Sequence, residues 1–304
     1  MALVQTHMVI DALKAANEGT SFQLKTMTTK GDQILNVALA KIGDKGLFTH
    51  ELEQSILDGT VDFAVHSLKD LPTSLPPKMI IGAVTKREVE GDVVIFRKDL
   101  PYKSLAELPP NSTVGSSSLR RIAQLKMSYP LLKFKDIRGN LNTRFNKLDD
   151  PGNEYSCIIL AASGVQRLGS PFVERISAHL EDLYWAPGQG ALAVETSQDN
   201  LQAIKLLKSI HNQRAYVTCT AERSFLEALG GGCQVPLGVK TSISEDGQRL
   251  VLDGIVLNLD GTEHIQGTTS GPLSEPIQIG QQLANQFLAK GAAVILEQVR
   301  NASK

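Results

Sequence analysis

The loop Gly230-Gly231-Gly232-Cys233-Gln234-Val235-Pro236 holds the residue best suited to covalent chemistry, a thiol that follows three glycines. Glycine removes side-chain crowding and permits a sharp turn, and Pro236 stiffens the exit. Most free cysteines are small buried hydrophobes, whereas an accessible thiol suits nucleophilic or redox chemistry. A tight turn with an incidental cysteine is the alternative, and the residues alone leave both interpretations open.

Hydroxyls and cations follow four predicted strands at the point where each strand ends. Ligands of open α/β sheets bind beyond the carboxyl ends of the strands, so we expect these side chains to converge. Arginines bind carboxylates through paired hydrogen bonds, and serine hydroxyls at a helix start receive oxyanions. The set therefore predicts an anionic ligand with several negative groups. Phosphate is the competing anion, but no GxxxxGK[ST] phosphate loop is present. Its members are Ser67, Lys69 and Asp70 after residues 62–65, Ser116, Ser117, Ser118, Arg120 and Arg121 after the strand at Val114, Arg138 and Arg144 after residues 134–137, and Ser163 and Arg167 after the strand that ends at Ala162.

Asp70 is the one acid of this set. A carboxylate among cations should stay ionised, since opposite charges favour the charged form. It could stabilise a positive charge that develops on a substrate and handle its protons, or it could simply pair with a lysine. The other members also have simpler interpretations, namely helix capping for the serines and surface charge for the arginines. Lys41 and Lys45 could form a basic loop, and Gln189 could be a turn residue.

Composition limits the class of protein. The chain has 304 residues, 42% of them hydrophobic, and a net charge of −1, which argues against a general nucleic-acid or membrane-surface binder. Its three cysteines are widely spaced without a CxxC pair, so we expect neither a disulfide framework nor a metal site. No run of 18 apolar residues predicts a membrane span. We expect a cytoplasmic protein.

The order of predicted elements suggests three domains. Strands and helices alternate up to about residue 210, which predicts largely parallel sheets covered by helices. A helix, three antiparallel strands and a final helix then form an α+β unit. We expect domain 1 over 1–86 and 190–210, domain 2 over 91–189 and domain 3 over 213–304. The predicted strands are 22–28, 62–67, 79–85, 92–97, 113–116, 132–137, 155–162, 190–196, 235–243, 249–259 and 263–270, and the helices are 1–16, 119–127, 141–148, 216–229 and 277–290.

Six ordered motifs, spread over nearly all of the chain, resemble the hydroxymethylbilane synthase (porphobilinogen deaminase) family. The resemblance implies two α/β domains of the periplasmic-binding-protein type and a C-terminal α+β domain with a small antiparallel sheet. The motifs are Lys41-Ile-Gly-Asp-Lys45, Val65-His-Ser-Leu-Lys-Asp-Leu-Pro72, Val114-Gly-Ser-Ser-Ser-Leu-Arg-Arg121, Ile137-Arg-Gly-Asn-Leu-Asn-Thr-Arg144, Ala186-Pro-Gly-Gln-Gly-Ala191 and Gly231-Gly-Cys-Gln-Val-Pro236.

The resemblance also implies a reaction. Family members attach a dipyrromethane cofactor by a thioether to the loop cysteine, here Cys233. Four porphobilinogen units lose ammonia and join its free end, and hydroxymethylbilane is released for tetrapyrrole synthesis. By resemblance, Asp70 is catalytic and the partners are porphobilinogen and the growing oligopyrrole, bound by a monomer. The implied cofactor ligands are Ser67, Lys69, Ser117, Ser118, Arg120, Arg121, Arg144 and Lys45, and the implied substrate ligands are Arg138, Arg167, Gln189 and Lys41.

The beginning of the chain departs from the family pattern. The family normally starts with a strand that reads roughly Arg-Ile-Gly-Thr-Arg-Lys-Ser, whereas a helix is predicted here from Met1. We therefore expect an N-terminally short form with weak or no activity. An inactive isoform and a non-catalytic small-anion binding protein of the same two-lobed fold are the alternatives. Cys233 and Asp70 discriminate against a simple binding protein, which needs neither an exposed thiol nor an acid in a basic cleft.

Overall fold

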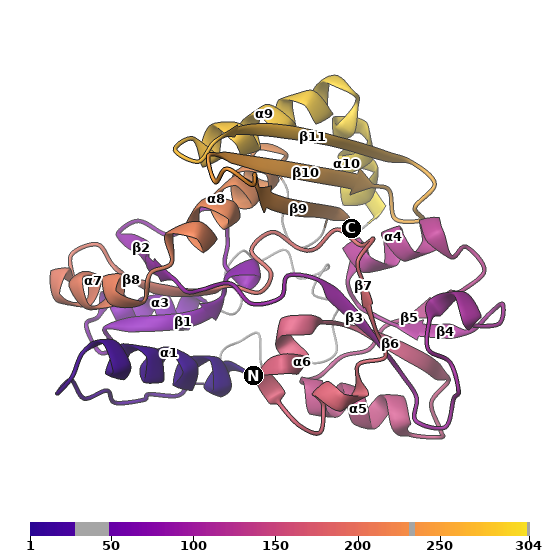
Figure 1. The fold of residues 1–304 in the computed structure, drawn as a ribbon, viewed down its shortest axis with the longest axis horizontal. Coiled ribbons are helices and arrows are strands. Elements are labelled where there is room, and N and C mark those ends of the chain that lie inside the picture. The colour runs from indigo at the N-terminus through magenta and orange to yellow at the C-terminus, as the bar shows by residue number, and fades with distance from the viewer. Residues whose placement is uncertain (28–48, 231–234, 303–304) are drawn as a thin grey trace.

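The computed structural model describes residues 1–27, 49–230 and 235–302. They form two α/β lobes that lie side by side and a C-terminal unit that contacts both, as Figure 1 shows. The predicted fold class, two α/β lobes plus a C-terminal α+β unit with an antiparallel sheet, is confirmed.

The first lobe is a three-stranded sheet between helices. Val9 and Leu13 of its first helix lie four residues apart on one face, the spacing of an amphipathic helix, and pack against Val194 on the central strand. Ile56 packs against Ala64 on the opposite face of the sheet. The elements are α1 (Ala2–Ala16), α3 (His50–Leu57), β1 (Phe63–Ser67), β2 (Met79–Val84), β8 (Leu192–Ser197) and α7 (Leu201–Leu207), in the strand order β1-β8-β2.

The second lobe is a five-stranded sheet. Its strand β3 is buried along its whole length, and every residue after the first is apolar. Val93 and Ile95 pack into a core on one face, and Val94 and Phe96 pack into a core on the other. Burial on both faces explains why this strand reads as a continuous apolar run. The elements are β3 (Asp92–Phe96), β4 (Thr113–Gly115), α4 (Leu119–Ser128), β5 (Lys133–Lys135), α5 (Leu141–Asp149), β6 (Tyr155–Ala161), α6 (Ala162–Leu168) and β7 (Ala178–Leu180), in the strand order β5-β4-β6-β3-β7.

The prediction of largely parallel sheets is wrong. In the first lobe, β1 and β2 are both antiparallel to β8, and in the second lobe β3 is antiparallel to β6 and β7. Among the described strands only β4 pairs in parallel, with β5 and with β6. The cause is topological, because β3 and β8 each enter their lobe from the other one and run against its remaining strands. A pattern of alternating strands and helices does not reveal such an exchange.

The C-terminal unit confirms the predicted antiparallel sheet. Its strands follow one another as neighbours in the order β11-β10-β9. Phe225 and Phe287 meet edge to face beneath the sheet, with ring centroids 5.1 Å apart. Gly280 lets its helix approach the backbone of Ala221, where a Cβ atom would clash with the carbonyl oxygen. The elements are α8 (Gln213–Ala228), β9 (Leu237–Ile243), β10 (Arg249–Leu257), β11 (His264–Pro272), α9 (Pro276–Ala289) and α10 (Ala292–Ala302).

The predicted strand over 22–28 is wrong for its described residues, because 22–27 form no strand. Phe22 instead packs edge-on against Phe63, with ring centroids 6.4 Å apart, so its burial comes from a ring contact and not from a ladder. The helices α3, α6, α7 and α10 were not predicted. The first three are eight residues or shorter, which leaves little periodic signal in the sequence.

Two stretches of chain cross between the lobes. Residues 85–91 join β2 to β3, and residues 181–191 join β7 to β8. We call them the crossing segments. Arg87 on the first donates through Nε to the backbone carbonyl of Gln189 on the second, at 2.8 Å, so the two segments are tied to each other where they pass.

Candidate functional site

The carboxyl ends of β4, β5 and β6 lie at one edge of the second sheet, because β4 runs parallel to both neighbours. The hydroxyl of Ser117, after β4, accepts from the backbone N–H of Ile137 at 3.2 Å and donates to its carbonyl at 3.0 Å. Ser118 caps α4 by accepting from the N–H of Arg121, and Ser116 accepts from the N–H of Ser118 at 3.3 Å. The predicted convergence of strand ends is confirmed, and the hydroxyls of the three serines hydrogen-bond to nearby backbone groups.

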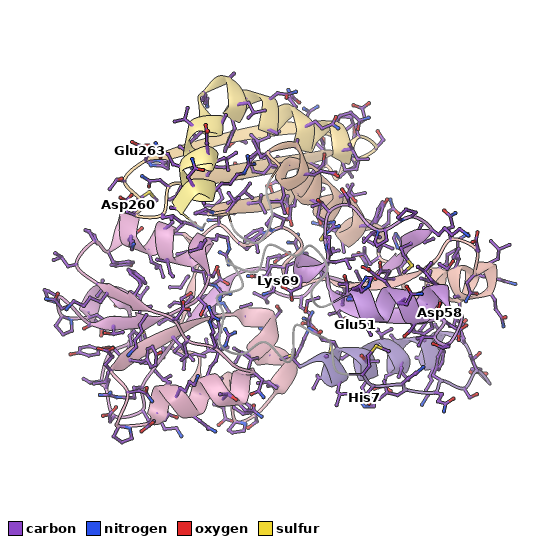
Figure 2. All side chains as sticks on the ribbon, turned by 180° about the vertical axis from the view of Figure 1, so that it is seen from behind. His7, Glu51, Asp58, Lys69, Asp260 and Glu263 are labelled. Atoms are coloured by element: carbon purple, nitrogen blue, oxygen red, sulfur yellow. The ribbon has the colours of Figure 1, made fainter. Side chains whose placement is uncertain are left out.

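Ser67, Lys69 and Asp70 come from the first lobe. β1 ends at Ser67 and continues directly into a short 3₁₀ turn over Leu68–Asp70, so no loop separates the strand from these side chains. Lys69 lies near the centre of the molecule in Figure 2, where the lobes and the C-terminal unit meet. Burial lowers the pKa of Lys69, and the charges near it are Asp70, Arg121, Asp92 and Arg120. The two lobes therefore contribute to one site.

Gln5 is a site residue that the sequence reasoning missed. It is buried on α1 and its amide donates to the hydroxyl of Ser67 at 2.7 Å. Gln5, Val9 and Leu13 form one buried stripe at intervals of four residues. A polar residue in an otherwise apolar stripe is the signal that could have identified it, because buried amides require hydrogen-bond partners.

Arg120 and Arg121 are buried and share one acid, Asp92. Arg120 Nη1 lies 2.8 Å from Asp92 Oδ2, and Arg121 Nη2 lies 2.7 Å from Asp92 Oδ1. Arg121 also donates to the carbonyl of Ile159 at 3.1 Å, and Arg120 donates to that of Tyr184. Although burial alone would raise it, the two guanidiniums hold the pKa of Asp92 well below its usual range. The strand ends had suggested Asp70 as the one acid of the site, but the assembled site also contains Asp92.

Arg144 and Arg138 extend the cluster. Arg144 Nε donates to the carbonyl of Gly139 at 2.9 Å. Burial lowers the pKa of Arg144, and the nearby charges of Arg121 and Arg138 lower it further while Asp70 opposes them. Arg138 itself makes an ion pair with Asp136 at 3.0 Å near the surface. Arg121, Arg138 and Arg144 therefore lie near one another, and Asp70 lies near Arg144.

Arg167 and Gln189 contact the crossing segments. Arg167 Nε lies 2.8 Å from Glu88 Oε2, and its Nη2 donates to the carbonyl of Gly190 at 2.7 Å. Gln189 is fully buried, and its amide donates to Asp92 Oδ1 at 3.0 Å, to the Gly91 carbonyl at 3.2 Å and to the Glu90 carbonyl. Their role in substrate binding stays a prediction.

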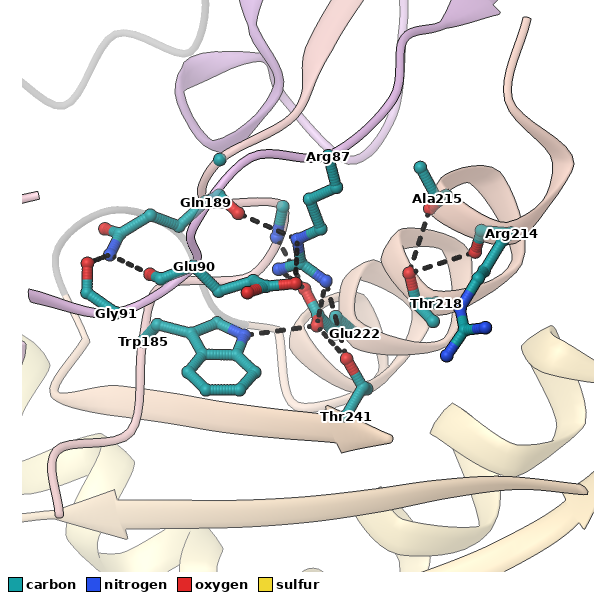
Figure 3. Close-up of polar contacts among 12 residues, drawn as sticks. Arg87, Glu90, Gly91, Trp185, Gln189, Arg214, Ala215, Thr218, Glu222 and Thr241 are labelled. Atoms are coloured by element: carbon teal, nitrogen blue, oxygen red, sulfur yellow. Dashed lines mark hydrogen bonds and ion pairs between the residues drawn. The ribbon is translucent and has the colours of Figure 1, made fainter. Parts of the chain in front are cut away.

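A buried ion pair ties the crossing segments to the C-terminal unit (Figure 3). Glu222 of α8 accepts two hydrogen bonds from Arg87, at 2.7 and 2.9 Å. The same carboxylate accepts from Gly188 N at 2.7 Å, Thr241 Oγ1 at 2.6 Å and Trp185 Nε1 at 3.2 Å. Although burial alone would lower it, Glu222 raises the pKa of Arg87. Neither residue was predicted, because they lie 135 positions apart.

Cys233, Lys41 and Lys45 lie outside the described residues. The chain before Cys233 is held by Arg300, whose Nη2 donates to the carbonyls of Leu229 and Gly230 at 3.5 and 3.1 Å. The remaining cysteines are buried, and burial raises the pKa of Cys219 to about 12 and that of Cys157 further. Neither of these two thiols is suited to act as a nucleophile.

Residues 1–27, 49–230 and 235–302 hold no group of histidines, cysteines and acids that could bind a metal ion. None of the helices in those ranges is both long and apolar enough to span a membrane.

Comparison with known families decides the relationship of the chain. Residues 1–205 match the family "Porphobilinogen deaminase, dipyromethane cofactor binding domain", and residues 216–289 match "Porphobilinogen deaminase, C-terminal domain". The chain belongs to the porphobilinogen deaminase family. This confirms the resemblance that the six motifs indicated.

Relatives in the porphobilinogen deaminase family match almost end to end. The chain is 50% identical over 302 residues to the porphobilinogen deaminase of Gloeobacter violaceus, with 98% of this chain and 90% of that protein covered. It is 46% identical to that of Dictyostelium discoideum, with 98% and 93% covered. Likeness to solved structures is weak: the BvgS periplasmic VFT2 domain of Bordetella pertussis is 17% identical with a TM-score of 0.38, over 71% of this chain and 82% of that one.

The site fits the family's cofactor on a specific observation. Arg121 Nε is buried and has no hydrogen-bond partner among the described residues, although both Nη atoms of the same side chain donate hydrogen bonds. A buried N–H without an acceptor is costly, so the position calls for an anionic oxygen. The acetate and propionate groups of dipyrromethane would supply such oxygens. Lys69, Arg120, Arg121 and Arg144, which lie near one another, would be the residues to receive them.

Proposed function

We propose that this chain performs the reaction of porphobilinogen deaminase, in place of the weak or absent activity expected from its first residues. In this reaction, porphobilinogen units join head to tail with loss of ammonia, and the product is hydroxymethylbilane for tetrapyrrole synthesis. The observation that carries the proposal is the convergence of Lys69 and Asp70 from the first lobe with Arg120, Arg121 and Arg144 from the second. A cationic wall opposite a carboxylate suits a substrate that brings several carboxylates and develops a positive charge.

The residues divide this work. When bound, dipyrromethane supplies the free pyrrole end to which the first substrate unit is added, and Cys233 is its proposed anchor. Lys69, Arg120, Arg121 and Arg144 would hold carboxylates by charge-assisted hydrogen bonds, each worth roughly 1.5–3 kcal/mol. Asp70 would stabilise the positive charge that develops as ammonia leaves, and it would move protons at its carboxylate oxygens.

The remaining site residues have supporting parts in this proposal. Ser67, Ser117 and Ser118 would orient the cofactor's oxygens, and Lys45 would contact them from outside the described residues. Arg138, Arg167 and Lys41 are the proposed substrate contacts, whereas Gln189, predicted as a fourth, is fully buried and its amide donates to Asp92. Gln5 supports the part given to Ser67, because its amide donates to the Ser67 hydroxyl oxygen and so fixes its position.

We further propose a cytoplasmic monomer with domains over 1–86 with 190–210, 91–189 and 213–304. The net charge of −1 and the widely spaced cysteines support the location. Each of the three sheets falls within one of these domains. Light scattering coupled to size-exclusion chromatography tests the monomer, and a mass near 32.9 kDa is expected.

Asp70→Asn tests the catalytic assignment. We expect the variant to load its cofactor, because the cationic wall is intact, and to form product at a rate lower by roughly two or more orders of magnitude. Intact mass spectrometry measures loading, and the appearance of hydroxymethylbilane measures turnover. Near-normal turnover in a loaded variant would remove Asp70 from the chemistry.

A further inference from the structure

Asp92 occupies a position that neither the motifs nor the family comparison assigns. It is the first residue of β3, directly after a crossing segment, and only 1% of its surface is exposed. Both carboxylate oxygens are in use: Oδ2 contacts Arg120, and Oδ1 accepts from Arg121 and from Gln189. A carboxylate this deeply buried is stable only with such complete pairing.

The two arginines depend on Asp92 for their arrangement. They are neighbours on the first turn of α4, and their charges repel each other while both are buried. One carboxylate between the Nη atoms offsets that repulsion and holds the guanidiniums side by side. It leaves Arg121 Nε without a partner among the described residues, and therefore available to a ligand carboxylate.

Gln189 connects this arrangement to the crossing segments between the lobes. Its side-chain amide donates to Asp92 and to the backbone carbonyls of Glu90 and Gly91, and its backbone carbonyl accepts from Arg87. Arg87 is in turn held by Glu222 of the C-terminal unit. An unbroken series of hydrogen bonds thus runs from α8 through both crossing segments to Arg120 and Arg121.

The geometry points to Asp92 as a positioning residue for the reaction, which aims Arg120 and Arg121 at the ligand carboxylates and is itself held in place by the Gln189 amide. The inference rests on the proposed function for its effect on turnover. Its electrostatic part does not, because two buried arginines need a counter-ion whatever the protein binds.

The first experiment replaces the counter-ion. In Asp92→Asn the two guanidiniums lose their shared negative charge, and inorganic sulfate is the probe that can supply one. We expect sulfate to raise the melting temperature of Asp92→Asn at least about twice as much as that of the parent, because an anion that binds the folded state stabilises it by mass action. Chloride at equal ionic strength is the salt control.

Asp149→Asn is the matched control variant. Asp149 also accepts two hydrogen bonds from one arginine of the second lobe, Arg175, at 2.8 and 2.9 Å, but it lies away from the site. It should respond to sulfate as the parent does and keep parental turnover. A sulfate response of Asp92→Asn equal to that of the parent would overturn the inference, whereas a variant that folds only in sulfate would support it.

Gln189→Met separates positioning from substrate binding without removing a charge. We expect kcat to fall at least about tenfold while KM stays within about threefold, because small misplacements of catalytic geometry are costly. A raised KM with unchanged kcat would make Gln189 a substrate ligand and overturn the inference. A parent chain without turnover would overturn the proposed function instead, and the sulfate comparison would still decide the role of Asp92.

Discussion

Glu222→Gln removes one charge from the ion pair that joins the crossing segments to the C-terminal unit. The substitution keeps the size of the side chain, so its cost is electrostatic and not one of packing. Arg87 would remain buried, with 6% of its side chain exposed. It would keep the Gln189 carbonyl as a neutral partner, and its remaining acid would be the partly exposed Glu90, 3.6 Å from Nε. A buried charge that loses its counter-ion is among the most destabilising changes in a protein.

The contacts set the size of the effect. Removing one partner of a buried ion pair costs about 3–5 kcal/mol. The amide of glutamine also cannot accept at both ends, so the N–H groups of Gly188 and Arg87 that now bond to Oε2 would face an NH₂ group. We therefore expect a loss of about 3–5 kcal/mol, a large part of the roughly 5–15 kcal/mol that stabilises a folded protein.

Urea unfolding monitored by tryptophan fluorescence measures this loss. The chain has one tryptophan, Trp185, whose indole donates to Glu222, so the signal reports on the affected region itself. The midpoint should fall while the m-value stays constant. Asp149→Asn, at a partly exposed pair, should cost about 1 kcal/mol or less.

A double variant tests the physical reason. Arg87→Met with Glu222→Gln removes both charges, while the glutamine oxygen can still accept from Thr241 and Trp185. Removing both partners of a buried pair often costs less than leaving one charge without the other. The double variant should therefore be more stable than Glu222→Gln alone. A loss below about 1 kcal/mol for Glu222→Gln would refute this reasoning. So would a double variant whose loss equals the sum of the losses in Arg87→Met and Glu222→Gln.

Two other predictions concern the first lobe and the crossing segments. Burial, together with nearby Glu195, raises the pKa of Glu53 above its ordinary value of 4.5, so the folded state holds this proton more tightly than the unfolded state does. That stabilisation is complete below pH 4.5 and is lost as the pH rises through the raised pKa. Glu53→Gln should therefore be more stable than the parent at neutral pH, with the difference shrinking in acid. A variant that is less stable than the parent at pH 7 in thermal melts would contradict this. Gly190 has φ +92°, and a Cβ there would lie 2.7 Å from the Glu88 carbonyl oxygen. Gly190→Ala should cost roughly 1–3 kcal/mol in urea unfolding, and Gly91→Ala, where nothing lies within 4 Å, should cost much less; equal losses would argue against backbone strain.

The sequence predicted the parts of the site that follow strand ends. Lys69, Asp70, Arg120 and Arg121 could be found because each comes within a few residues of an apolar run, and a strand end is a local feature. The antiparallel C-terminal sheet was predictable for the same reason, since its strands are neighbours in sequence.

The sequence could not predict what depends on the path of the chain between the lobes. Asp92 reads as the first residue of a buried strand, and nothing near it in sequence shows that it meets arginines 28 and 29 positions away. Glu222 and Arg87 are likewise joined only by the fold. The sense of β3 and β8 follows from their exchange between lobes, which local periodicity does not record.

The most direct test of the proposed function is the intact mass of the purified chain after incubation with porphobilinogen, with Cys233→Ala in parallel. We expect the parent to exceed its polypeptide mass by a covalently bound dipyrromethane and to react with Ehrlich's reagent. The Cys233→Ala protein should fold and show neither property. A parent chain that weighs only what its polypeptide weighs, or a Cys233→Ala chain that carries the same added mass, would contradict the account.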